Sequence, residues 1–188
     1  MVQSMTKQAS SEQTAEKIQK LVMADFKAHL IFWPLAISGL ALDLWSKSAV
    51  FYWLDTLESY SVIDGFLQLI RAQNPGAAWG IFPKKTIFLI GVASIALIVI
   101  IILFLFSGKQ PRVIQVAMGF FAAGISGNLY DRIFNNGHVR DFIDAYYHNN
   151  HWPTFNVADS LLCIGVGLLI ISTIFTGKPA QKHDQPQK

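Results

Sequence analysis

The sequence predicts an all-α integral membrane protein that crosses the bilayer with four helices. Of its 188 residues, 52% are hydrophobic and only 14% are charged, whereas soluble domains carry about 25% charged residues. Residues 86–106 form an uncharged apolar run, which is long enough for a helix to cross a hydrocarbon core of about 30 Å. The composition also excludes a largely disordered chain, and the single cysteine excludes an intrachain disulfide or a multi-cysteine metal cluster.

Three further runs complete the predicted set, at residues 28–44, 113–130 and 157–176. The run at 28–44 is the shortest and contains Pro34, so a cleaved signal peptide is its alternative interpretation. We favour an uncleaved helix, because Pro34 and Asp43 interrupt the apolar stretch that a signal peptide needs. The chain then divides into a polar tail at 1–27, a membrane domain at 28–176 and a second polar tail at 177–188.

Lysine and arginine residues set the expected orientation. With the N-terminus inside, nine of the fifteen fall in the inner segments 1–27, 107–112 and 177–188, which are shorter in total than the outer segments. Cytoplasmic loops carry such an excess, so both termini are expected in the cytoplasm. Residues 1–20 and 179–188 are polar and poor in aromatic residues, and we expect them to be disordered.

Polar residues at membrane level gather at one end of the predicted helices. In this topology the outer ends of three helices carry Asp43, Asn128, Arg132, Asn156 and Asp159. Any one of these residues, taken alone, is explained by a position among the polar lipid headgroups. Ionisable residues inside membranes are costly and usually functional, and three helices that deliver them to the same level predict a functional site there.

The third helix carries small residues at Gly119, Ala123 and Gly127, one every fourth position, which allows close approach of neighbouring helices. Asn128 and Arg132 share a face of that helix because they are four residues apart. We expect the arginine to meet a carboxylate. The outer candidates are Asp131, Asp141, Asp144 and Asp159.

Carboxylates gathered at a membrane interface can support peptide hydrolysis. Two carboxylates held together at low dielectric share one proton, so the ionised partner can activate water while the neutral one polarises a carbonyl. This chemistry needs no metal or other cofactor, and none is expected. Spacing alone does not choose the pair among the outer aspartates.

Five ordered motifs carry a family resemblance. They are Asp-Leu-Trp-Ser-Lys at 43–47, Asn-Pro-Gly-Ala-Ala-Trp at 74–79, Gly-Asn-Leu-Tyr-Asp-Arg at 127–132, Val-Arg-Asp-Phe-Ile-Asp at 139–144 and Phe-Asn-Val-Ala-Asp-Ser at 155–160. Together they resemble the lipoprotein signal peptidases (signal peptidase II) over about residues 28–176. Each motif is weak alone, whereas five in order on four spans are specific.

The resemblance implies an aspartic endopeptidase of the bacterial inner membrane that cuts signal peptides from prolipoproteins, just before a cysteine bearing a diacylglyceryl group. It implies that Asp141 and Asp159 are the catalytic dyad. The implied substrate-site residues are Asp43, Lys47, Asn74, Asn128, Arg132 and Asn156. It also implies a small outer β-sheet cradle and a short interfacial helix, which suit residues 45–85.

The implied partners are lipid-modified prolipoproteins and membrane lipids, with no nucleic acid, and we expect a monomer. Two features depart from the family pattern. Arg140 stands where the family usually has an aliphatic residue, and we expect its side chain to point toward headgroups or solvent. The loop before Asp141 is about one residue longer than usual, at Asn135 and Asn136.

Several residues have simpler interpretations. His148 and His151 could bind a metal with Asp144, but a solvated loop is the simpler interpretation. Cys163 is expected to be a small buried hydrophobic residue, and Lys47 could merely extend to headgroups. Of the tryptophans, which are expected as interface anchors, Trp79 alone is placed to pack near the site.

Two other functions remain open at this point. A small ion- or proton-coupled transporter also uses carboxylates within membrane helices, but transport needs polar groups near the midplane, where these helices are apolar. A non-catalytic assembly subunit explains the small residues of the third helix and leaves the clustered Asp, Asn and Arg residues unexplained.

Overall fold

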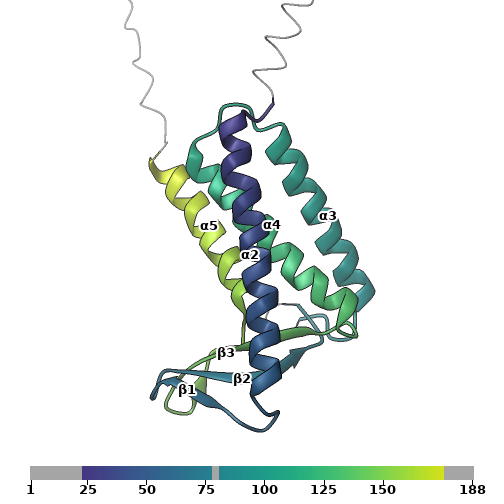
Figure 1. The fold of residues 1–188 in the computed structure, drawn as a ribbon, viewed down its shortest axis with the longest axis vertical. Coiled ribbons are helices and arrows are strands. Elements are labelled where there is room, and N and C mark those ends of the chain that lie inside the picture. Colours follow the sequence, from purple (N-terminus) through teal and green to yellow (C-terminus); the bar gives the residue numbers. More distant parts are fainter. Residues whose placement is uncertain (1–22, 78–80, 176–188) are drawn as a thin grey trace, which may run out of the picture.

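The structure, a computed structural model, describes residues 23–77 and 81–175. The two terminal segments expected to be disordered, and Trp79, lie outside the described residues. Four long helices run side by side, and a small β-sheet lies across one end of the bundle (Figure 1). The first residues of the first helix and the last residues of the fourth lie together at the opposite end (Figure 1).

The helices are α2 (Phe26–Trp53), α3 (Thr86–Leu105), α4 (Arg112–Phe134) and α5 (Val157–Phe175). Each is long and apolar enough to cross a membrane. The four predicted spans are therefore found, with the predicted order and loops. Pro34 is accommodated inside α2, which continues on both sides of it.

The first span is longer than predicted, because α2 continues nine residues past Leu44, to Trp53. At 1.5 Å per residue its 28 residues reach about 42 Å, which exceeds a hydrocarbon core of about 30 Å. Asp43 and Lys47 lie within this helix and pair with each other across one turn at 2.7 Å. The predicted third span is likewise extended, from Tyr130 to Phe134.

The sheet contains β1 (Tyr60–Ile63), β2 (Leu67–Asn74), β3 (Val139–Tyr147) and β4 (Asn150–His151) in that spatial order, all antiparallel. It confirms the small sheet implied by the resemblance. A separate short helix is not formed in the described residues 54–77 and 81–85. Strand β3 follows α4 after a turn with a left-handed Asn136 and Gly137 (φ 51° and 84°), so the lengthened loop forms a compact turn.

Helix α4 lies at the centre of the bundle and packs against the other three helices. Its small residues permit close approach, as predicted. A Cβ atom built on Gly124 lies 2.6 Å from the carbonyl oxygen of Ala158, and one built on Gly127 overlaps the carboxylate of Asp43. The absence of side chains at these glycines therefore brings α2 and α5 against the same segment of α4.

Helix α3 is the most exposed of the four, because among its residues only Leu89 and Phe104 are buried. Phe104 stacks on Phe32 of α2, with ring centroids 3.9 Å apart, in an apolar cluster that also includes Met118 and Ala122 of α4. The remaining exposed side chains of α3 are apolar, as suits a surface solvated by lipid.

The close approach at Gly124 can be tested by thermal unfolding in detergent micelles. Gly124→Ala should lower the melting temperature, because the added methyl group meets backbone of α5, and overpacking of this kind costs about 1–3 kcal/mol. Gly167→Ala on α5 is the matched control, because no atom lies within 4 Å of its built Cβ. Equal melting temperatures for the two variants would contradict the packing described here.

Candidate active site

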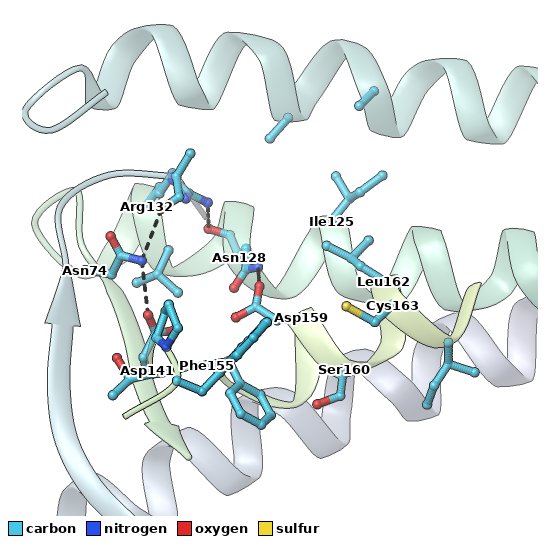
Figure 2. Close-up of a pocket in the computed structure, with 18 residues that line it drawn as sticks. Asn74, Ile125, Asn128, Arg132, Asp141, Phe155, Asp159, Ser160, Leu162 and Cys163 are labelled. Atoms are coloured by element: carbon cyan, nitrogen blue, oxygen red, sulfur yellow. Dashed lines mark hydrogen bonds between the residues drawn. The ribbon is translucent and has the colours of Figure 1, made fainter. Parts of the chain in front are cut away.

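Two aspartates from different elements line one pocket at the sheet end of the bundle. Asp141 lies on β3 and Asp159 lies in the first turn of α5. Both border a cavity of about 800 Å³ (Figure 2). The structure thus brings together the two residues that the resemblance implied as a dyad, although they are eighteen positions apart in the chain.

Asn156 connects the two carboxylates. Its amide Nδ2 donates to Asp141 Oδ1 at 2.6 Å, and its backbone N–H donates to Asp159 Oδ2 at 3.2 Å. In return the backbone N–H of Asp159 donates to Asn156 Oδ1 at 3.0 Å. This reciprocal pair is a capping arrangement at the start of α5, so the geometry that begins the helix also orients both aspartates.

Two further amides hold the aspartates from other elements. Asn74 at the end of β2 donates to Asp141 Oδ2 at 3.1 Å, and Asn128 of α4 donates to Asp159 Oδ1 at 2.8 Å. Asn156 also donates to Asn128 Oδ1 at 3.2 Å. Each carboxylate therefore accepts hydrogen bonds at both oxygens and has its orientation fixed before any substrate arrives.

The burial of Asp141 changes its protonation. Asp141 is 1% exposed. Its burial, as the larger cause, and the negative charge of Asp159, as the second, raise its pKa to about 7. The hydrogen bonds from Asn74 and Asn156 and the charge of Lys47 oppose this shift. Near neutral pH, Asp141 is thus a carboxyl group that can hold a proton while it lies beside a second carboxylate.

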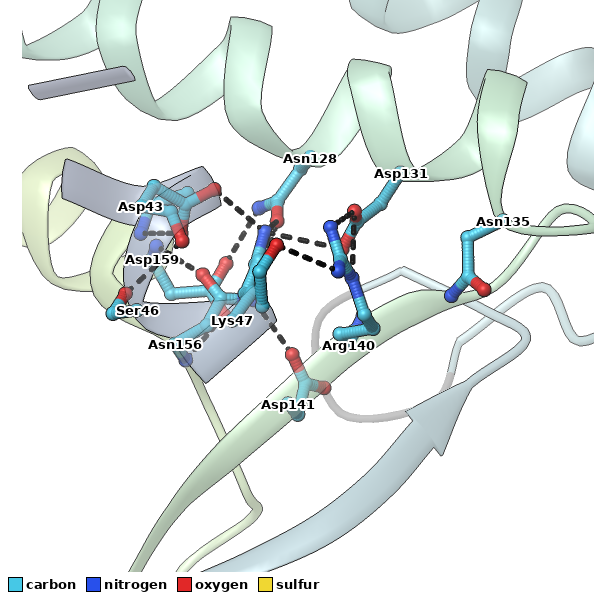
Figure 3. Close-up of polar contacts among 12 residues, drawn as sticks. Asp43, Ser46, Lys47, Asn128, Asp131, Asn135, Arg140, Asp141, Asn156 and Asp159 are labelled. Atoms are coloured by element: carbon cyan, nitrogen blue, oxygen red, sulfur yellow. Dashed lines mark hydrogen bonds and ion pairs between the residues drawn. The ribbon is translucent and has the colours of Figure 1, made fainter. Parts of the chain in front are cut away.

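A buried charge cluster around Lys47, with Asp43 and Asp131, lies next to Asp141 and Asp159 (Figure 3). Lys47 is fully buried, and its Nζ lies 2.7 Å from Asp43 Oδ2, 3.3 Å from Asp131 Oδ2 and 3.2 Å from Asn128 Oδ1. Its ammonium group is therefore enclosed by protein and does not extend to headgroups. The other oxygen of Asp43 accepts from the backbone N–H of Ala158 at 2.8 Å, which joins α2 to the first turn of α5.

The expectation for Arg140 is wrong. Its guanidinium does not point to headgroups or solvent but binds Asp131, with Nη2 and Nε at 2.7 and 3.1 Å from Oδ1. The side chain of Arg140 is 17% exposed and that of Asp131 is fully buried. Lys47 lies between two buried carboxylates and its single charge balances only one of them. A buried charge is costly without a partner, so Arg140 completes the pairing of Asp131.

Arg132 differs from expectation as well. We expected it to pair with a carboxylate, whereas its guanidinium donates to the backbone carbonyls of Asn128 and Gly76 at 3.1 and 2.8 Å. Asn74 donates to the carbonyl of Ala77 in the same loop at 3.3 Å. These bonds hold residues 74–77 over α4, so Arg132 shapes the rim of the pocket.

The predicted substrate-site residues separate into two groups. Asn74, Asn128 and Arg132 line the pocket together with the aspartates. Asp43 and Lys47 lie behind it in the buried charge cluster, and Asn156 connects the two groups.

The pocket has an apolar side that the sequence did not reveal. Its lining includes Ala93 and Ala96 of α3, the segment Trp152–Phe155 before α5, and Ile125, Leu162, Cys163 and Ile164. Cys163 was expected to be buried but is exposed and borders the pocket. The only sequence signal was the small size of Ala93 and Ala96 in a helix otherwise rich in large aliphatic residues.

The histidines do not assemble a metal site in the described part of the chain. Among those residues, no group of three His, Cys, Asp or Glu side chains could hold a metal ion. His151 instead contacts Asp144 through Nδ1 at 2.9 Å, and Gln68 donates to the same carboxylate at 2.7 Å. Asp144 therefore connects β2, β3 and β4 within the sheet.

Comparison with known proteins identifies relatives over most of the chain. The family described as signal peptidase (SPase) II matches residues 35–175. The lipoprotein signal peptidase of Halalkalibacterium halodurans is 35% identical over 154 residues, which cover 82% of this chain and 98% of that protein.

Two solved structures, each described as a bacterial membrane enzyme obtained by the in meso method, share the fold. One has a TM-score of 0.73 at 31% identity and covers 89% of this chain and 99% of the solved chain. The other has a TM-score of 0.70 at 31% identity and covers 84% and 99%. The chain thus belongs to the signal peptidase II family, the lipoprotein signal peptidases, and is a multi-pass membrane peptidase of the aspartic type.

Proposed function

We propose that this peptidase removes signal peptides from diacylglyceryl-modified prolipoproteins and cuts before the lipidated cysteine with Asp141 and Asp159 as its catalytic dyad. Membership of the family already makes it a peptidase of lipoprotein precursors and favours this function over a transporter or an assembly subunit. The observation that carries the dyad is that Asn156 binds both aspartates at the edge of one pocket.

The two aspartates have different environments, which suggests different roles. Asp141 has its pKa raised to about 7 by burial and by Asp159, so it is the partner that holds the shared proton and polarises the scissile carbonyl. Asp159 accepts N–H bonds at both oxygens at the start of α5, where the helix dipole favours negative charge. It is the partner that removes a proton from water.

The proton balance closes over one cycle. Asp159 takes a proton from the attacking water while Asp141 gives its proton to the carbonyl oxygen, and a tetrahedral diol forms. Asp159 then protonates the leaving nitrogen, Asp141 recovers a proton from one diol hydroxyl, and the C–N bond breaks. The dyad ends as it began, with one proton on Asp141, and no other reactant is consumed.

The other predicted substrate-site residues are assigned supporting roles. Asn74, Asn128 and Arg132 line the pocket and can meet the peptide backbone of the substrate. Asp43, Lys47 and Asn156 hold those residues and the dyad in place through buried contacts.

The substrate assay compares the lipidated prolipoprotein with its unlipidated form, each incubated with purified protein in detergent. Cleavage of only the lipidated form, unaffected by metal chelators, is expected. Asp141→Asn and Asp159→Asn should each abolish cleavage, because neither variant retains the pair that exchanges a proton with water and substrate.

Asp144→Asn is the matched control, because Asp144 is equally buried on β3 but contacts Gln68 and His151 and does not line the pocket. It should retain most of the turnover per folded molecule, because Asp144 contacts neither carboxylate of the dyad. Substantial turnover by either dyad variant in folded protein contradicts the dyad.

The pH dependence follows from the raised pKa of Asp141. Activity requires its proton, so kcat/KM should fall as pH rises through about 7, with an apparent value that belongs to the coupled pair. Asn74→Ala removes a hydrogen bond that favours the ionised form of Asp141. The fall of kcat/KM on the alkaline side of the pH profile (the alkaline limb) should therefore move to higher pH. Gln68→Ala, which affects only Asp144, is the control and should leave the limb in place. An alkaline limb that stays fixed or moves to lower pH in Asn74→Ala contradicts the assignment.

We further propose that the protein lies in the inner membrane with the sheet end outside and both termini in the cytoplasm, as the lysine and arginine distribution favours. In a Cys163→Ser background, a membrane-impermeant maleimide should label Glu58→Cys in spheroplasts and leave Lys109→Cys unlabelled until lysis. Both positions are exposed. Glu58 lies between α2 and β1, and Lys109 lies between α3 and α4, and these two connections are at opposite ends of the bundle (Figure 1). Labelling of only Lys109→Cys before lysis would reverse the orientation.

A further inference from the structure

Arg140 binds the fully buried carboxylate of Asp131 with unusual completeness. Its Nη2 and Nε both lie within 3.1 Å of Asp131 Oδ1, and its own backbone N–H donates to Asp131 Oδ2 at 2.9 Å. One residue of β3 thus occupies both oxygens of a carboxylate on α4. The remaining Nη1 lies 3.3 Å from Ser48 Oγ on α2, so Arg140 joins three elements.

This contact lies next to Asp141 in the chain. Consecutive side chains of a strand point to opposite faces, so Arg140 faces the buried charge cluster (Figure 3), while Asp141 lines the pocket (Figure 2). Because consecutive Cα atoms are fixed 3.8 Å apart, a contact that holds residue 140 on α4 also limits how far Asp141 can move from that helix.

The same contact reaches Asp159 by a second route. Asp131 binds both cations, because Arg140 Nη2 lies 2.7 Å from its Oδ1 and Lys47 Nζ lies 3.3 Å from its Oδ2. The same ammonium group donates to Asn128 Oδ1 at 3.2 Å, so Asp131 and Asn128 are joined through Lys47. With that oxygen accepting from Lys47, the Nδ2 group of Asn128 is directed at Asp159.

We propose that Arg140 is a positioning residue that sets the separation and orientation of the two aspartates, by fixing β3 to α4 through Asp131. The proposal rests on the proposed function of the dyad. Arg140 touches neither carboxylate of the dyad itself and acts through Asp131. The planar guanidinium suits this role because two of its N–H groups reach Asp131 Oδ1 while a third donor remains for Ser48, whereas an aliphatic side chain offers no donor.

The test measures kcat, KM and the alkaline limb for Arg140→Val, per folded molecule and well below the melting temperature of the variant. We expect kcat to fall at least tenfold with KM changed less than threefold, because the dyad is displaced while the pocket walls remain. The alkaline limb should move to lower pH, because a loosened Asp141 is better solvated and farther from Asp159, and both changes favour ionisation.

A merely structural role lowers the melting temperature without moving kcat per folded molecule or the limb. Arg140→Lys keeps the positive charge but loses the planar set of guanidinium donors. Relative to Arg140→Val, it should recover part of the loss in kcat and part of the shift of the alkaline limb. Ser48→Ala removes only the third contact of Arg140 and should keep kcat within twofold. If Arg140→Val does not accumulate as folded protein, Arg140→Gln, which keeps a single donor, replaces it with the same expectations.

The positioning role is overturned if Arg140→Val, or Arg140→Gln in its place, has the kcat and the alkaline limb of the unmodified protein. If only the positioning role fails, Asp141→Asn and Asp159→Asn are inactive while the Arg140 variant is fully active. If the proposed function fails, the unmodified protein does not cleave the lipidated substrate, or the dyad variants remain active.

Discussion

The site depends on the burial of Lys47 between α2, α4 and the first turn of α5. An ammonium group removed from water is very costly unless it is paired and hydrogen-bonded, and Lys47 finds two carboxylates and the amide oxygen of Asn128 within 3.3 Å. Those partners come from two helices, so the need to neutralise one charge fixes how the helices meet. Asp43, on the same helix turn, extends the constraint to α5 through the backbone of Ala158.

The arrangement of cations also explains how Asp141 keeps a raised pKa close to so much positive charge. Lys47 and Arg140 are each engaged by carboxylates behind the site, and Arg132 donates to backbone carbonyls at its rim. Asp141 accepts from neutral amides instead, and burial beside Asp159 outweighs them. A cation paired directly with Asp141 would hold it ionised and remove the proton that the proposed mechanism uses.

Sequence patterns predicted the four helices and the level of the site, because apolar length and the position of polar residues along a helix both depend on local sequence. They did not predict the partner of Arg140, which depends on how β3 meets α4. One local signal was available: if 139–147 is a strand, residues 140 and 141 must face opposite sides, so Arg140 is directed away from the pocket. The wall formed by Trp152–Phe155 required the tertiary fold, because that segment has no regular periodicity.

The pocket has one polar side and one apolar side. One side presents the aspartates, amides and Arg132, and the other presents Ala93, Ala96 and aliphatic residues of α4 and α5. An amphipathic cavity of this kind favours an amphipathic ligand, with apolar groups beside the helices and a peptide bond at the polar end. Because α3 contributes only small side chains to the lining and is otherwise exposed, the apolar side lies close to lipid. Under the proposed function, a substrate anchored in the bilayer can therefore present its scissile bond to Asp141 and Asp159 without leaving the membrane.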